Sequence, residues 1–276
     1  MDTMSGGPET DNSARRPPQK VSENFNADDA DVSFVSSDDV LFHIHRKTLE
    51  VNAGAFPPAE FDTHGEIAQL TEDAATLELL FQFIYPRRHP HLGSTPFESL
   101  ALLAEAAEKY EVFAAMNVCW IRMRSFVPEH AAAVFEYASR HGYKEIMGQA
   151  APFLLDTPLH EIVGMFSAEL VVPWVRYREG WTAAVYKALH TPMLPEGMYI
   201  LHSKTGKKCT SCSIDLDNGL GAMLWFALGE RRSLAAVDDV FEKVTPMCKH
   251  IDKERCRRDV EAALKVQEIP GFETFL

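Results

Sequence analysis

The stretch HIHRKTLEVNAGAF, residues 43–56, changes its hydrophobic period halfway along. Read from two residues earlier, its first half is LFHIH, whose alternation puts Phe42 and Ile44 on one face of a strand. The second half abandons alternation, and its apolar residues recur at helical spacing: Leu49, Ala53 and Phe56. We therefore predict a strand that ends at His45 and passes without a loop into a short helix, residues 46–55.

The neighbouring segments complete a small α+β domain, which we place at residues 25–126. Apolar residues at 32–35 predict a first strand, and the SSDD turn after it makes a hairpin with the strand that ends at His45. A third, short strand is expected within residues 66–70. Apolar stripes predict three further helices, from Thr71 to Pro86, from Pro96 through Ala107, and from Val112 to Met123. Strands followed by helices are typical of the α+β class.

The residues before this domain differ from it in composition. Residues 1–24 are rich in Gly, Pro, Ser, Asp and Asn, and Val21 is their only sizeable apolar side chain after Met4. Such a segment buries too little surface to offset the entropy that it loses on ordering. We therefore predict a disordered tail over residues 1–24 and the start of ordered structure near Phe25.

The second half of the chain has a helical pattern almost throughout, so residues 127–276 are predicted to form an all-α C-terminal region. Helices are expected at residues 129–141, 143–154, 158–166 and 168–190. The stretch 191–213 is rich in Gly, Pro and Lys and is predicted to be a loop, with two or three more helices after it.

Composition and charge restrict the class of protein. In 276 residues, of which 46% are hydrophobic, no apolar run approaches the ~20 residues of a membrane span, and the first residues are too polar for a signal peptide. Five cysteines, an odd number, favour a reducing compartment, which is the cytoplasm or the nucleus. The formal net charge of −13 disfavours broad contact with phosphate backbones. We expect an intracellular protein that binds neither membranes nor nucleic acids.

The order of motifs in residues 25–126 resembles the BTB/POZ fold. The family pattern is a strand that begins Asp-Val, a polar turn, and a strand that ends in His before a helix with a buried Leu and a Phe. Here the corresponding residues are Asp31-Val32, SSDD at 36–39, FHIH at 42–45, Leu49 and Phe56. Further on, TLELLFQFIY at 76–85 is similar to the family's helix that ends in Tyr, and LLAEAAEKYEV at 102–112 to its alanine-rich helix. The layout of the whole chain is similar to that of fungal BTB-domain proteins.

The resemblance implies a non-enzymatic protein–protein interaction module whose partner is another protein. An alternative is that the chain is a substrate adaptor of a cullin-type ubiquitin ligase, since many relatives act in this way. Such adaptors often carry an apolar-x-Glu element after the helix that Phe56 would end, and Pro58-Ala59-Glu60 is a poor match to it. A cullin is thus a candidate partner.

The chain also departs from the family pattern. Many members form domain-swapped dimers through an additional helix and strand before the Asp-Val strand, and residues 1–24 offer no apolar helical stripe for that purpose. We therefore expect a weak homodimer of this type or none. Pro86 and Arg87 stand where the family usually has a Gly after the Tyr.

The histidines of the opening stretch favour a structural role. His45 at the strand end is expected to bond nearby backbone through a ring nitrogen while the helix after it packs on the sheet. His43 and His45 share one strand face and form the alternative, a metal site, but the sequence offers no evident third ligand.

Catalytic signatures are absent from the sequence, which contains no GxxxxGK[ST], GxSxG or HExxH pattern, and we expect no enzymatic activity. One motif has ligand chemistry, the CxxC of a Gly/Lys-rich stretch. It forms half of a candidate zinc site, which Cys248 and His250 complete, so that the four ligands are Cys209, Cys212, Cys248 and His250. The alternative is that these are free thiols in a loop, because a lone CxxC often binds no metal. No other cofactor is expected.

Overall fold

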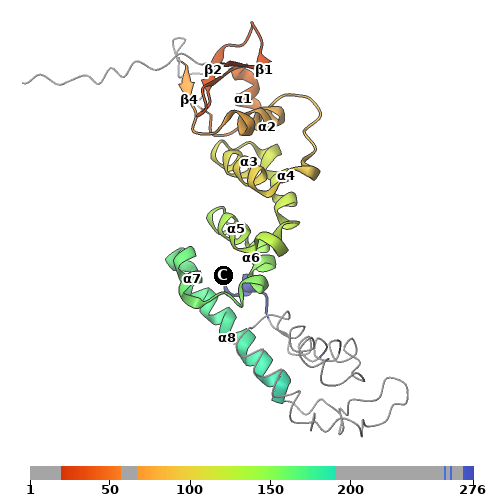
Figure 1. The fold of residues 1–276 in the computed structure, drawn as a ribbon, viewed down its shortest axis with the longest axis vertical. Coiled ribbons are helices and arrows are strands. Elements are labelled where there is room, and N and C mark those ends of the chain that lie inside the picture. Colours follow the sequence, from red (N-terminus) through yellow and green to blue (C-terminus); the bar gives the residue numbers. More distant parts are fainter. Residues whose placement is uncertain (1–19, 57–66, 191–257, 259–261, 263–269) are drawn as a thin grey trace, which may run out of the picture. The chain divides into compact units, whose positions relative to one another are not determined.

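The computed structural model describes residues 20–56, 67–190, 258, 262 and 270–276, which Figure 1 shows in colour. The chain divides into two compact units, Met1–Met123 and Arg124–Leu276. The first unit is a mixture of strands and helices, with a small four-stranded sheet near its start.

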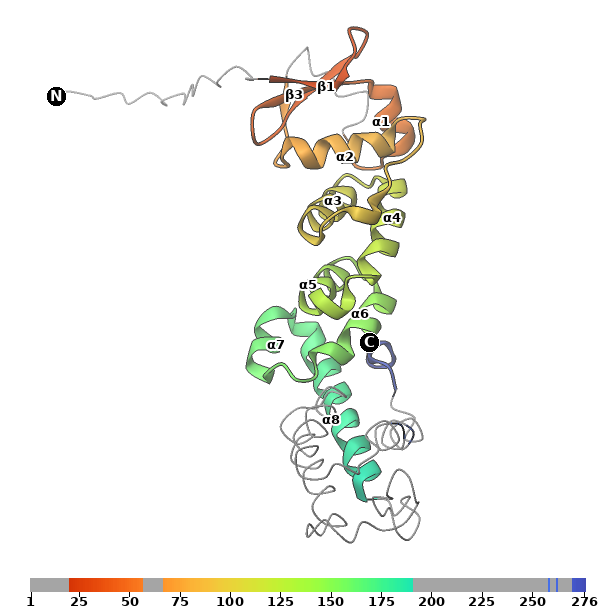
Figure 2. The same cartoon turned by 45° about the vertical axis from the view of Figure 1, so that its right-hand side comes forward.

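The sheet of the first unit has the order β1-β3-β2-β4. Its strands are β1 (Lys20–Asn26), β2 (Val32–Val35), β3 (Val40–Ile44) and β4 (Ala68–Gln69). β2 and β3 form the expected antiparallel hairpin, in which Phe34 lies opposite Phe42. β1 runs parallel to β3, and β4 runs parallel to β2. Figure 2 shows β1 and β3 together on one side of α2.

The turn between β2 and β3 is built by the residues that predicted it. The Ser36 backbone N–H donates to the Val40 carbonyl at 2.9 Å, and the Asp39 N–H donates to the Ser36 carbonyl at 3.1 Å. Asp39 has a φ of 63°, a left-handed conformation that Asp tolerates better than most residues. The polar turn therefore fixes the register of the hairpin.

The prediction of a disordered tail was wrong for residues 20–24, because they form most of β1. Composition missed this strand since only Phe25 in it is a large buried apolar residue. Its backbone pairs with β3, and the hydroxyl of buried Ser22 donates to Glu78 of α2. Asn24 Nδ2 donates to the same carboxylate at 3.0 Å. Polar contacts to residues far along the chain thus stabilise a strand that buries little apolar surface. The rest of the predicted tail, residues 1–19, lies outside the described residues.

The helices of the first unit follow the apolar stripes of the sequence. They are α1 (Arg46–Asn52), α2 (Ala74–Ile84), the 3-10 turn η1 (Leu92–Ser94), α3 (Phe97–Lys109) and α4 (Phe113–Arg124). At the start of α2 the Asp73 carboxylate accepts the Thr76 N–H at 2.7 Å, and the Asp38 carboxylate of the hairpin turn accepts the Ala74 N–H at 2.8 Å. Two carboxylates therefore stabilise this helix N-terminus.

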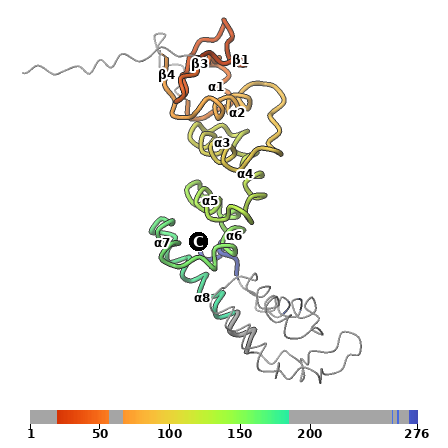
Figure 3. The backbone as a smooth tube through the Cα atoms, viewed as in Figure 1, coloured from red at the N-terminus to blue at the C-terminus, as the bar shows by residue number. Residues whose placement is uncertain are grey.

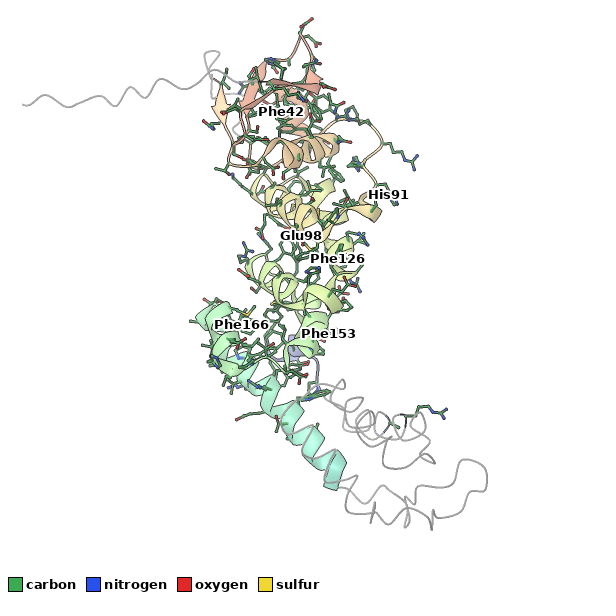
Figure 4. All side chains as sticks on the ribbon, in the orientation of Figure 1. Phe42, His91, Glu98, Phe126, Phe153 and Phe166 are labelled. Carbon is green, nitrogen blue, oxygen red and sulfur yellow. The ribbon has the colours of Figure 1, made fainter. Side chains whose placement is uncertain are left out.

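Aromatic rings fill the space between the sheet and α2, around the residue labelled Phe42 in Figure 4. Phe42 and Phe81 lie 5.5 Å apart between ring centroids, and Phe25 lies 5.6 Å from Phe81. Phe34 stacks on Phe81 at 6.0 Å. Each of these rings is at most 3% exposed, so the residues of the opening strand face the core as their alternation predicts.

The second unit is helical in its described parts. Its elements are α5 (Val127–Arg140), α6 (Lys144–Ala150), the 3-10 turn η2 (Ala151–Leu154), α7 (Leu159–Met165), α8 (Ala168–His190) and the 3-10 turn η3 (Phe272–Phe275). The four helical segments expected between residues 129 and 190 are all present. The expected loop at 191–213 and the helices after it lie outside the described residues.

The core of the second unit is also aromatic. Phe135 of α5 stacks on Phe166 at 4.6 Å and lies 6.1 Å from Trp174 of α8. Phe272 from η3 lies 5.3 Å from Phe135 and is fully buried. In Figure 3 the blue segment that carries it lies beside α6. Nothing in the helical periodicity predicted that this segment returns to the helices.

In the parts of the chain that the structure describes, none of the helices combines the length and the apolar run that crossing a membrane requires.

Candidate interaction site

Most of the residues that the sequence analysis proposed as metal ligands or partner contacts lie outside the described residues. The candidate zinc ligands Cys209, Cys212, Cys248 and His250 all fall outside the described residues, as does the Pro58-Ala59-Glu60 element. The site is therefore built from the first unit, where the motifs that carry the resemblance are described.

The end of β3 and the end of α2 meet at a hydrogen-bonded junction. The backbone N–H of His45 donates to the Tyr85 hydroxyl at 3.1 Å, and His45 Nδ1 lies 2.9 Å from the same oxygen. His45 Nε2 lies 3.2 Å from a carboxylate oxygen of Asp29. All three contacts are satisfied when the hydroxyl donates to Nδ1 and Nε2–H donates to Asp29. The ring thus bonds side chains, and the expectation that it bonds nearby backbone was wrong.

This correction has a physical reason, because the partner of His45 is forty residues away in the sequence. Tyr85 is the C-cap of α2, and the fold brings its ring to 5.6 Å from Phe25. The Arg87 guanidinium lies 4.9 Å from the centre of the Phe25 ring and 5.5 Å from that of Tyr85. Burial raises the pKa of Tyr85, which keeps its hydroxyl protonated and able to donate. The junction therefore has a structural role: it holds the start of α1 and Phe25 of β1 against the end of α2.

His43 has a partner of its own. Its Nδ1 lies 2.9 Å from the Ser33 hydroxyl on β2. Because the two histidines of the strand are engaged separately, the structure gives no support to the alternative metal site at this point. Within the described ranges, no group of three His, Cys, Asp or Glu side chains converges in a way that could hold a metal ion.

A second polar network joins the start of α2 to the end of α3. Lys109 Nζ donates to a Glu72 carboxylate oxygen at 2.7 Å and to the Thr71 hydroxyl at 2.7 Å, and the Tyr110 hydroxyl donates to the other Glu72 oxygen at 2.6 Å. Burial alone would raise the pKa of Glu72, but the hydrogen bonds from Lys109 and Tyr110 outweigh it and the pKa is lowered. The carboxylate is thus held in its ionised form.

The loop after α1 is fixed against the corner between α3 and α4. Gly54 N–H donates to the Glu111 carbonyl at 3.1 Å, and Ala55 N–H donates to the Tyr110 carbonyl at 3.2 Å. Phe56 then stacks on the Tyr110 ring at 4.5 Å, with 8° between the ring planes. Phe56, the last described residue before segment 57–66, is therefore held against the α3–α4 corner.

Next to this corner, α4 presents apolar side chains to solvent. Phe113 is 57% exposed and Ile121 is 64% exposed, and with exposed Asn117 they recur every four residues along one face of the helix. Val51 on α1 is 73% exposed and lies three residues before Gly54, where the loop bonded to the α3–α4 corner begins.

Sequence reasoning missed this exposed face, although a signal was present. The stripe that predicted the helix contains Val112, Met116, Cys119 and Met123, and Phe113 and Ile121 fall outside it. Large apolar residues off the buried stripe of an amphipathic helix are positions that the domain's own core does not cover. Exposed apolar side chains of this kind are suited to binding another protein.

Cys119 is the one cysteine that the structure describes, and it is buried on the other face of α4. Burial, together with the charge of Glu108, raises the pKa of its thiol to about 12. The thiolate is therefore scarce at neutral pH, and Cys119 behaves as a packing residue.

Comparison with known proteins gives no further identification: no family model, no curated protein and no solved structure matches the chain.

Proposed function

We propose that this chain is a non-enzymatic protein–protein interaction module built on a BTB/POZ-like domain. The observation that carries the proposal is the junction of His45 with Tyr85. These two residues end two of the motifs on which the resemblance rests, FHIH and TLELLFQFIY, and a direct bond between them gives both residues a role in the same fold. Val32 of the Asp-Val step begins β2, and Phe56 packs against the α3–α4 corner, which supports the same proposal.

The partner surface that we propose is the exposed face of α4. Removing a Phe and an Ile side chain from water at an interface contributes about 1.5–3 kcal/mol each, before the costs of association. Apolar and aromatic residues at the centre of an interface commonly dominate its energetics. The proposed compartment is the cytoplasm or nucleus, as the cysteine content favours, and a swapped homodimer is proposed to be weak or absent.

The test is a crosslinking and mass-spectrometry survey of partners from native extract, made with the full chain and with a Phe113→Asp/Ile121→Asp variant. We expect the variant to lose partners that the unmodified chain recovers, because two charges would have to be desolvated at the interface. Leu102→Asp is the matched control, since Leu102 is 54% exposed on α3. Equal recovery by all three proteins would exclude the α4 face.

A substrate adaptor of a cullin-type ubiquitin ligase is the second candidate. It is favoured by one observation, the anchoring of Phe56 at the start of the segment that contains Pro58-Ala59-Glu60. A pull-down of the full chain with a purified cullin N-terminal region tests it. Binding at micromolar concentration that is lost on Glu60→Lys would support the adaptor function. If the full chain does not bind, a cullin is not its partner, and only the first candidate function remains.

A further inference from the structure

A short segment far along the chain packs into the second unit as a bound peptide would. Residues 270–276 contact α6 and α8, although residue 270 follows the end of α8 at His190 by 80 positions (270 − 190). Figures 1 and 2 show this blue segment beside α6. The contact is made by a 3-10 turn of sequence FETF, residues 272–275.

Phe272 is the deepest anchor of the segment. It is fully buried, and its ring centroid lies 5.3 Å from Phe135, 5.7 Å from Trp174 and 5.5 Å from Tyr177. These three rings, from α5 and α8, are called the aromatic cradle below. Three aromatic partners at these spacings make a well-filled site for one phenyl ring.

Two later side chains of the segment, Glu273 and Phe275, lie beside glycines of the helices. A Cβ atom added to Gly148 of α6 would overlap with the Glu273 carboxylate, and one added to Gly180 of α8 would lie 3.8 Å from the tip of the Phe275 ring. Phe275 lies 6.1 Å from Tyr177. The absence of a side chain at Gly148 therefore leaves room for the Glu273 carboxylate, while Phe275 lies beside Gly180 without requiring a glycine there.

The segment is held by side chains. The backbone hydrogen bond that the structure describes within it runs from Thr274 N–H to the Gly271 carbonyl, at 3.0 Å, and the described backbone bonds include none from it to α6 or α8. Trp174 Nε1 is buried in the cradle without a hydrogen-bond partner among the described residues. A segment attached in this way can leave and be replaced without opening a backbone ladder.

We propose that the aromatic cradle is a binding site for a partner protein's Phe-Glu-x-Phe segment, and that residues 272–275 occupy it as a competing occupant in the same chain. The partner is defined by two Phe three positions apart with an acidic residue after the first. Because the segment belongs to the same chain, its competition with a partner does not weaken on dilution, so a partner must bind the cradle more tightly than the free segment would in order to displace it. This inference rests on the second unit and holds whether or not the first unit is BTB/POZ-like.

The test uses a fluorescein-labelled peptide GFETFL, residues 271–276, and fluorescence anisotropy. The full chain carrying Phe272→Ala/Phe275→Ala has an emptied cradle and should bind the peptide at least tenfold more tightly than the unmodified chain. Adding Gly180→Leu to that variant should reduce binding, because the new side chain fills the place of Phe275. A control peptide with both Phe replaced by Ala should not bind.

Three outcomes overturn the proposal. The first is equal binding to both chains while the variant keeps its circular dichroism spectrum, and the second is equal binding of the control peptide. The third is a concentration-dependent dimer of the unmodified chain that the Phe272→Ala/Phe275→Ala variant does not form, which would make a second copy the occupant. If the double variant loses its helical signal, Phe275→Ala alone replaces it. That residue is only half-buried, and a failure of this variant to bind the peptide more tightly than the unmodified chain also overturns the proposal.

Discussion

Leu49 is the buried side chain of α1 and the first apolar residue of the helical half of the opening stretch. It is 3% exposed, so Leu49→Ala removes methyl groups from a closed core and leaves a cavity. We expect the free energy of unfolding to fall by about 2–5 kcal/mol. Urea unfolding of the full chain, followed by far-ultraviolet circular dichroism, measures this change.

Val51→Ala is the control for Leu49→Ala, because Val51 lies on the same helix and is 73% exposed. Its effect should stay within about 0.5 kcal/mol. Similar losses in both variants would mean that α1 does not pack as described.

Glu72 makes the stability of the first unit depend on pH. Its folded pKa is lowered, against the effect of burial, by hydrogen bonds from Lys109 and Tyr110. A lowered folded pKa means that the stabilisation is complete above the unfolded value, about 4.3, and is lost as the pH falls through the folded value. We expect Glu72→Gln to cost about 1–3 kcal/mol at pH 7 and progressively less below pH ~4.5. Urea unfolding at several pH values measures the difference.

The exposed Glu50 on α1 provides a control substitution of the same kind. At pH 7, Glu50→Gln should change the free energy of unfolding by less than about 0.5 kcal/mol. A difference between Glu72→Gln and the unmodified chain that stays constant from pH 7 to pH 3 would contradict the account of Glu72.

At the scale of the element, β1 is the strand that composition did not predict. It contributes buried Phe25 and the Ser22 and Asn24 contacts to Glu78. Deleting residues 1–19 should change the melting temperature by less than about 2 °C, whereas deleting residues 1–26 should lower it by about 8 °C or more, since a Phe core contact alone is worth about 3–5 kcal/mol. Thermal unfolding of both truncated chains, at equal concentration, decides between a strand and a dispensable tail.

The elements that the sequence predicted best are those whose local signals agree. Alternation identified β3, and the caps and stripes identified α2 and α8, because burial of one face imposes a period on the residues themselves. β1 has no such period, since it is an edge strand with a register shift between Val21 and Asn26. Its stability comes from a strand and a helix that lie later in the chain.

In the candidate site, too, the sequence did not reveal contacts between residues that lie far apart in the chain. The sequence singled out His45, yet its partner Tyr85 follows forty residues later and only the fold joins them. The exposed face of α4 was readable in principle from Phe113 and Ile121, which stand off the buried stripe. The return of Phe272 to the helices had no local signal, because a single Phe in a short segment carries no period.

At the scale of the whole molecule, the zinc hypothesis stays a prediction. Zinc held by Cys209, Cys212, Cys248 and His250 would link two stretches about forty residues apart and would remove loop entropy from the unfolded chain. Protein purified without added metal should then contain about one zinc per chain, and Cys209→Ser should release it. Atomic emission measures the content, and values near zero in the unmodified protein identify these residues as free thiols and a surface imidazole.

Each of the two compact units has an aromatic core of its own, and this gives a prediction for the entire chain. Phe135 is fully buried against Phe166, Trp174 and Phe272, so Phe135→Ala should destabilise the second unit by about 3–5 kcal/mol. Hydrogen exchange read by mass spectrometry should then accelerate in peptides from α5 and α8, while peptides from α2 keep their protection.

Phe153→Ala is the matched control for Phe135→Ala, because it removes the same side chain at a position in η2 that is 51% exposed. It should leave exchange in α5 and α8 nearly unchanged, whereas Leu49→Ala should accelerate exchange in α2 alone. Local opening follows the core that a side chain fills, so the two buried substitutions should act on different sets of peptides. Equal acceleration of α2 and α8 by Phe135→Ala would show instead that the whole chain opens as one cooperative body.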